Sequence, residues 1–318
     1  MFKHILTPVD GSTLSECALP HAVTLSQAFD ARVTLLRVVE RNRTSGVSRA
    51  IDPLYWQIRK AEARAYLEEL ASRFEEAGLQ PEEALLEGDA AEHIVAFARN
   101  HDVDLIVMST HGQSGLSGWN VSSVVQKVIL GMHIPVMIVR AYMCATSEMK
   151  PLQYQRLMVP LDGSPRAECI LPLATTLARL HECPLLLAHV VAKPEVARRT
   201  PPTAEEMELV DQLTERNRQA GAQYLEQLKS QLPSEVETRL LISDNAAVTL
   251  HELVKQENID LMLLSAHGYS GEARWPYGSI ALNFIVYGTT PLLIMQDIPE
   301  KTAQHMEAER AAMETKGH

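Results

Sequence analysis

Two stretches of the sequence have the residue types of a phosphate-binding loop. Residues 109–123 read STHGQSGLSGWNVSS, and residues 265–279 read SAHGYSGEARWPYGS. Glycine lacks a Cβ, so its backbone can approach an anion closely, and a following helix adds unpaired N–H donors with a partial positive charge. The alternative is that each loop only caps a helix after a strand. Neither stretch is a P-loop, because Gly-Lys-Ser/Thr is missing, and neither has the Gly-x-Gly-x-x-Gly dinucleotide pattern.

Acidic and histidine residues accompany these loops. Asp10 and Asp162 each follow an apolar run and open an Asp-Gly-Ser sequence. An Asp in this position can bind a ribose hydroxyl, hold a cation beside phosphates, or cap the helix that follows. His111 and His267 directly precede a loop glycine. They can donate to a phosphate or fix the loop to its own backbone.

Other catalytic and metal patterns are missing from the sequence. Residues 251–255, HELVK, begin like a zincin helix but have Lys where the second His is needed, so we expect no metal pair. The Gly-x-Ser-x-Gly nucleophile elbow does not occur. Cys17 and Cys169 lie on the apolar face of a predicted helix, where core packing is expected. We therefore predict that the protein is not an enzyme, while slow ATP hydrolysis stays open with no identifiable base.

The sequence contains an internal duplication. Residues 5–27 align with 157–179, sharing Pro-x-Asp-Gly-Ser and Glu-Cys-x-Leu-Pro, and residues 104–112 match 260–268. Such self-similarity indicates a duplicated unit. The predicted organisation is a first domain at 1–140, a linker at 141–155, a second domain at 156–297 and a charged tail at 298–318.

Strand and helix signals alternate within each half. Short continuous apolar strands separated by helices indicate a parallel sheet covered on both faces, which is a doubly wound α/β domain. Ligands of such domains bind beyond the carboxyl ends of the strands. If the first and fourth strands are neighbours, the Asp-Gly-Ser turn and the glycine-rich loop face one crevice. In the first half the expected strands are 3–9, 32–39, 83–88, 104–109 and 134–139, and the expected helices are 14–29, 54–77, 90–101 and 121–131.

The overall composition limits the classes of function. The 318 residues carry a formal net charge of −11 without a strongly basic patch, which argues against a nucleic-acid partner. Four scattered cysteines without a CxxC pair are typical of a reduced, cytoplasmic protein. The N-terminus does not have the pattern of a secretory signal, and no apolar run approaches the ~20 residues that span a bilayer. We expect a soluble cytoplasmic protein that does not bind membranes.

On these residues the sequence resembles the universal stress protein family in its tandem, two-domain form. The resemblance is carried by TPVDGS and VPLDGS, LLRVV and LLAHVV, GDAAEHI, and MSTHGQSGLS followed by VQKVI and IPVMIVR. It implies a five-stranded parallel sheet in each domain, with strand order 3-2-1-4-5 and helices on both faces. It also implies a stress-response sensor or regulator that binds an adenine nucleotide, ATP or AMP, with Mg²⁺ as its companion, between strands 1 and 4.

The nucleotide-binding pattern of that family is Gly-x2-Gly-x9-Gly-Ser/Thr, and both halves depart from it. Ser109 and Ser265 replace the first glycine. The second half keeps Gly278, whereas Ser122 stands there in the first half, so we expect the second half to be the better site. The resemblance assigns reading of the adenine to the backbone at Val38 and Val190. The candidate binding residues are Asp162, Val190, Ser265, His267, Gly268, Gly271, Gly278 and Ser279 in the second half, and Asp10, Val38, Gly112, Gly115, Ser122 and Ser123 in the first.

Two other interpretations stay open. One is an interaction or scaffold protein of the same family that binds no nucleotide and acts through an unknown protein partner. The other is an ATPase or a relative of the ATP-pyrophosphatases, which would need a Ser-Gly-Gly-x-Asp-Ser type of loop after the first strand. The fifth strand of each half is expected at a sheet edge, and exposed edges are normally covered. A homodimer or a pseudo-dimer within the chain would cover it.

Overall fold

The computed structural model describes residues 1–40, 53–113, 115, 121–141, 149–194, 203–233, 235–269 and 276–297. The chain forms two compact units, which divide between Gln153 and Tyr154. Each unit contains five strands, and the two units are described in turn.

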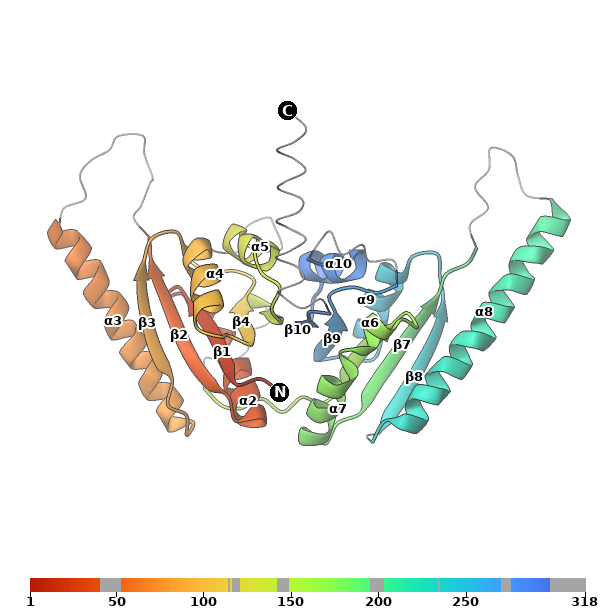
Figure 1. Cartoon of the computed structure of the whole chain (residues 1–318), viewed down its shortest axis with the longest axis horizontal. Helices are drawn as coiled ribbons and strands as arrows, with labels where there is room; N and C mark the ends of the chain where they lie inside the picture. The colour runs from red at the N-terminus through yellow and green to blue at the C-terminus, as the bar shows by residue number, and fades with distance from the viewer. Residues whose placement is uncertain are drawn as a thin grey trace, which may run out of the picture. The chain divides into compact units, whose positions relative to one another are not determined.

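The sheet of the first unit has the strand order β3-β2-β1-β4-β5, and every neighbouring pair is parallel (Figure 1). The predicted order 3-2-1-4-5 is therefore confirmed. Its strands are dominated by Val, Ile and Leu because both faces of a parallel sheet are covered by helices. Their bounds are β1 His4–Val9, β2 Arg32–Val39, β3 Glu82–Glu87, β4 Leu105–Ser109 and β5 Val136–Val139.

Helices cover both faces of this sheet. Right-handed crossovers place α1, α2 and α3 on one face as the chain moves from β1 out to β3. The chain then returns to β4 and β5, which places α4 and α5 on the other face, packed against each other (Figure 1). The bounds are α1 Thr13–Glu16, α2 Leu19–Phe29, α3 Pro53–Glu76, α4 Ala90–Asn100 and α5 Ser123–Leu130.

The second unit repeats this topology with the strand order β8-β7-β6-β9-β10. Its strand pairs are also parallel. None of the helices in the described parts of the chain is long and apolar enough to cross a membrane. The strands are β6 Leu157–Leu161, β7 Leu185–Val191, β8 Val236–Ile242, β9 Leu261–Ser265 and β10 Leu292–Met295, and the helices are α6 Pro165–Glu168, α7 Leu171–Leu180, α8 Ala204–Gln231, α9 Ala246–Gln256 and α10 Ser279–Tyr287.

The single helix expected over residues 14–29 is wrong in one respect, because the structure divides it into α1 and α2. Pro20 lies in the first turn of α2. Proline has no N–H to donate to the carbonyl one turn earlier, so it starts a helix readily but cannot continue one. Pro172 divides α6 from α7 in the same way.

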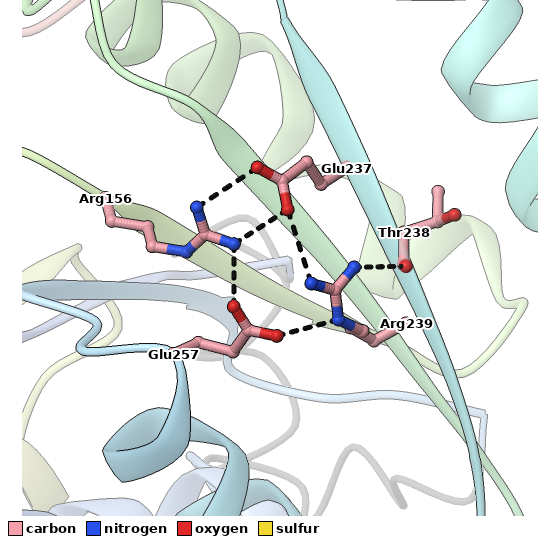
Figure 2. Close-up of polar contacts among 5 residues, drawn as sticks. All are labelled: Arg156, Glu237, Thr238, Arg239 and Glu257. Carbon is pink, nitrogen blue, oxygen red and sulfur yellow. Dashed lines mark hydrogen bonds and ion pairs between the residues drawn. The ribbon is translucent and has the colours of Figure 1, made fainter.

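An ionic network joins the strand ends of the second unit that lie away from the crevice. Arg156, just before β6, binds both carboxylate oxygens of Glu237 at 3.1 and 2.7 Å and one oxygen of Glu257 at 2.7 Å. Arg239 closes the ring by donating from Nε to Glu257 at 2.7 Å and from Nη2 to Glu237 at 3.4 Å (Figure 2). The hydrogen bond from Arg156 holds the pKa of the Glu237 carboxyl below its ordinary value. The two arginines and the two glutamates balance one another in charge, so we assign the network a structural role.

One titratable side chain lies in the core of the first unit. His21 is 8% exposed on α2, and burial lowers its pKa to about 4. The equivalent residue of the second unit is Leu173, which is wholly buried. The duplicated core therefore accepts either an imidazole or an isobutyl group at this position.

His21 should make the stability of the first unit depend on pH. Above an unfolded-state pKa of about 6.5 the imidazole is neutral in both states and has no effect. As the pH falls from there toward 4, the unfolded chain takes up a proton that the folded chain does not, and about 3 kcal/mol of stability is lost. We predict that His21→Leu removes this loss, as measured by urea denaturation at several pH values, and that Leu173→His introduces a similar one. Parallel pH profiles for His21→Leu and the wild type would contradict the assignment.

Candidate functional site

The carboxylate of Asp10 connects the two loops at the crevice of the first unit. Its Oδ1 accepts hydrogen bonds from the N–H and hydroxyl of Ser12 at 3.0 and 2.5 Å. Its Oδ2 accepts one from the N–H of Gln113, after β4, at 2.5 Å. Gly11, between Asp10 and Ser12, has φ +81, a left-handed conformation that glycine adopts without strain. One side chain therefore joins the turn after β1 to the loop after β4.

The second unit has the same connection. Asp162 accepts from the N–H and hydroxyl of Ser164 at 3.0 and 2.6 Å and from the N–H of Tyr269 at 2.6 Å. Gly163 has φ +83. The alternative that the Asp itself caps the following helix is wrong, because Ser12 caps α1 and Ser164 caps α6. The Asp instead accepts hydrogen bonds from the capping serine.

The connection requires glycine at one position of each loop. A Cβ on Gly112 would overlap Oδ2 of Asp10, and a Cβ on Gly268 would overlap Oδ2 of Asp162. Glycine is needed here because the backbone passes directly over the carboxylate.

A cavity of about 310 Å³ opens at this edge of the first unit. It brings together candidate residues from β1, β2, the loop after β4 and the start of α5, including Val38. Gly115 does not line it and has φ +72. The candidate residues that do line this cavity are Asp10, Val38, Gly112, Ser122 and Ser123.

The corresponding cavity of the second unit measures about 130 Å³. It also gathers the residues that the sequence indicated, whereas Gly271 lies outside the described residues. The predicted lining residues are Asp162, Val190, Ser265, His267, Gly268, Gly278 and Ser279.

The larger cavity is in the first unit, whereas Gly278 led us to expect the better site in the second unit. Gly278 and Ser122 both have extended backbones, with φ −73 and −67, so neither position demands glycine. A Cβ on Gly278 would meet its nearest atom, the carbonyl oxygen of Ala266, at 3.4 Å, an ordinary contact. Ser122 instead caps α5, accepting from the N–H of Val125 at 3.3 Å. The exchange of glycine for serine therefore gives no reason to prefer the second unit.

Equivalent serines have different hydrogen bonding in the two cavities. The Oγ of Ser109 is buried and has no partner among the described residues. The Oγ of Ser265 accepts a hydrogen bond from Cys169 Sγ at 3.5 Å. A buried hydroxyl without a partner costs free energy unless a ligand or water satisfies it. Each serine lines the cavity of its own unit, and only the Oγ of Ser109 is without a partner in the described parts of the chain.

The two loop histidines act within the protein. His267 Nδ1 lies 2.7 Å from Oδ1 of Asp297, and both side chains are buried. Burial is the largest single influence and raises the pKa of the Asp297 carboxyl, but the hydrogen bond and charge of His267, a backbone hydrogen bond and the charge of Arg166 together outweigh it, so the pKa is lowered. In the first unit His111 Nδ1 lies 3.1 Å from the Thr110 hydroxyl. Both contacts support the role of fixing the loop over that of donating to a phosphate.

Sequence analysis missed an arginine in the first cavity. Arg37 is 8% exposed on β2 and lines the cavity with Glu40 and Arg59. The signal was a lone charged residue inside the apolar run LLRVV. Only the packing of α3 against β2 shows that this charge is held at the site rather than in solvent.

Parallel α/β units with a crevice beyond the carboxyl ends of the central strands define the doubly wound class, in which ligands bind at that edge. Residues 1–140 and 153–296 both match the model of the Universal stress protein family. These segments make up most of the chain, which therefore belongs to the universal stress protein family as two domains in tandem.

Curated relatives resemble one half of the chain at a time. Universal stress protein MJ0531 of Methanocaldococcus jannaschii is 35% identical over 141 residues, covering 44% of this chain and 83% of the relative. Universal stress protein YxiE of Bacillus subtilis is 32% identical over 148 residues, covering 44% of this chain and all of the relative.

A solved structure resembles nearly the whole chain. A universal stress protein from Archaeoglobus fulgidus covers 93% of this chain and 98% of its own, with a TM-score of 0.63 and 17% identity. At that identity the likeness concerns the fold alone.

The close approach of Gly112 to Asp10 leads to a stability prediction. Gly112→Ala should displace the carboxylate from Gln113 and destabilise the first unit by about 1–3 kcal/mol, as forced overpacking does. The control is Ser122→Gly, which should cost only a few tenths of a kcal/mol as a change of cap. Urea denaturation measures both, and equal costs would contradict the role given to Gly112.

Proposed function

We propose that the protein binds an adenine nucleotide in the cavity of the first unit and acts as a binding regulator in the stress response. The observation that carries the proposal is the buried hydroxyl of Ser109, which has no partner in the part of the chain that the structure describes; Ser109 lines a cavity that the start of α5 also lines. Pockets for ligands of this size measure about 300–1,000 Å³. The first cavity, at about 310 Å³, reaches that range, and the second, at about 130 Å³, does not.

The start of α5 supplies the phosphate end of the proposed site. Ser123 and Val124, in its first turn, line the cavity. The first N–H groups of a helix have no intrahelical partner, and the macrodipole places partial positive charge there. The first turn of α5 contains no acidic residue that would compete with a phosphate.

The opposite part of the cavity suits a nucleoside. Ala90, Ile94 and Met108 give it an apolar lining beside Val38, whose backbone the family resemblance assigns to the adenine. A carboxylate offers about four acceptor sites, and Asp10 uses three of them. One remains for a ribose hydroxyl.

The proposed mechanism is binding, in which occupancy of the cavity biases conformation or association with a protein partner. Groups of three or more His, Cys, Asp or Glu side chains that could hold a metal ion do not occur among the described residues. A Mg²⁺ ion bound with the nucleotide would keep the phosphates and water as its main ligands. The proposal assigns no catalytic step to the chain.

A matched pair of variants tests which unit binds. Ser123→Glu puts a carboxylate at the start of α5, and Ser279→Glu does the same at α10. Acidic residues stabilise helix N-termini, so both variants should fold. By calorimetry with ATP and AMP, we predict that Ser123→Glu loses at least about tenfold in affinity, or about 1.4 kcal/mol, through repulsion of the phosphate. Ser279→Glu should match the wild type.

The other results of this experiment have definite meanings. Loss of affinity in Ser279→Glu alone would move the site to the second unit. Absence of ATP and AMP binding by the wild type would overturn the proposal in favour of an interaction protein that binds no nucleotide.

A further inference from the structure

Arg37 is a buried cation with unused hydrogen-bonding capacity. It lies near the end of β2, a strand in which all the residues after Arg32 are buried. Its Nη1 donates to the carbonyl of Val9 at 3.4 Å. Its Nε has no acceptor among the described residues. Burial lowers the pKa of the guanidinium and nearby Asp10 partly restores it, but an arginine remains charged in proteins.

The guanidinium lies on the face of the sheet away from α5. Its charge interacts with Tyr66 and Arg59, both on α3. Successive residues of a strand point to opposite faces, so Val38 faces the side covered by α4 and α5. Arg37 therefore enters the cavity from the side of the sheet that α3 covers, whereas the start of α5 enters it from the other side. We expect the two to serve different parts of the ligand.

Arg37 stands beside Asp10, the proposed ribose position. Its Nη2 lies 3.6 Å from where a Cβ on Gly11 would stand, directly after that aspartate. The group that Arg37 can reach is consequently the ribose or a substituent on it.

Two carboxylates and two cations line this side of the cavity. The carboxylates already accept hydrogen bonds from the protein: Asp10 accepts three, and Glu40 accepts one from the N–H of Ala90 at 3.0 Å. Arg59 contributes a second cation, with its Nη1 3.4 Å from the carbonyl of Glu40. The Nε of Arg37 has no acceptor within the described ranges of the chain, although both carboxylates lie nearby, and such a donor favours an anionic group as its partner.

The second unit lacks this arrangement. His189 takes the place of Arg37 in the strand pairing, opposite Leu161 where Arg37 is opposite Val9. Its Nδ1 lies 2.8 Å from the carbonyl of Leu161, and its ring packs against Tyr224 with centroids 5.8 Å apart. It does not line the second cavity. The cationic side of the cavity is thus a property of the first unit.

We propose that the preferred ligand of the first unit is an adenine nucleotide with a second phosphate on its ribose, at the 2′ or 3′ position, bound by Arg37. This inference rests on the proposed nucleotide site. Arginine pairs with phosphate through parallel N–H···O bonds, and an arginine near the ribose accommodates a ribose phosphate in other doubly wound folds. The 5′-phosphate would remain at the start of α5.

The test is calorimetry on the full chain with AMP, adenosine 2′,5′-bisphosphate and adenosine 3′,5′-bisphosphate. We expect the wild type to bind one of the bisphosphates at least about tenfold more tightly than AMP. Arg37→His, which copies the second unit, should reduce that preference to less than about threefold, because it should weaken the bisphosphate more than AMP. Arg37→Lys, which keeps the charge, should retain part of the preference.

His189→Arg is the matched control, and it should leave the preference of the wild type unchanged. Equal binding of AMP and both bisphosphates by the wild type would overturn this inference and leave the proposed function standing. Equal weakening of AMP and bisphosphate by Arg37→His would also overturn it, because it would show a general structural role. Absence of binding by all three nucleotides would overturn the proposed function as well.

Discussion

The crevice of each unit depends on one carboxylate that accepts hydrogen bonds from two loops. In the first unit, one oxygen of Asp10 is held by Ser12 in its own turn, and the other is held by the backbone of Gln113 after β4. β1 and β4 are neighbours in the sheet, so this contact fixes how their loops leave it. Asp162 has the same bonds in the second unit. The helix start and the cavity wall both follow from this contact.

This constraint determines which loop residues are free to differ between the units. Gly112 and Gly268 cannot carry a side chain, because the backbone there lies against the carboxylate. Ser122 and Gly278 lie further along, in extended backbone where either residue fits. Duplication has therefore kept the glycine that the fold requires and exchanged the one that it does not. A glycine can match a motif for steric reasons that have no bearing on the ligand.

Much of the fold could be predicted from the sequence because it depends on local and repeated signals. Apolar runs, Asp-Gly-Ser turns and the internal repeat indicate the strands and the class, and the family resemblance implies the strand order. The division between α1 and α2 was missed, although Pro20 carries the signal. The relative size of the cavities could not be predicted, since residues far apart in the sequence line each of them. Nor could the pairing of His267 with Asp297, because contacts between distant residues have no local signature.

The two units differ in the hydrogen bonds that equivalent residues make. Ser109 and Ser265 are the same residue in the same place, yet only Ser265 has a partner, which Cys169 supplies. Arg37 has an unused donor, whereas the equivalent His189 is held by Leu161 and packed against Tyr224. In the second unit these positions are satisfied by the protein itself. In the first unit these residues leave buried polar atoms beside a larger cavity, and each such atom costs free energy that a ligand or water can recover. Binding by the first unit is therefore supported by the groups that its own fold leaves unpaired.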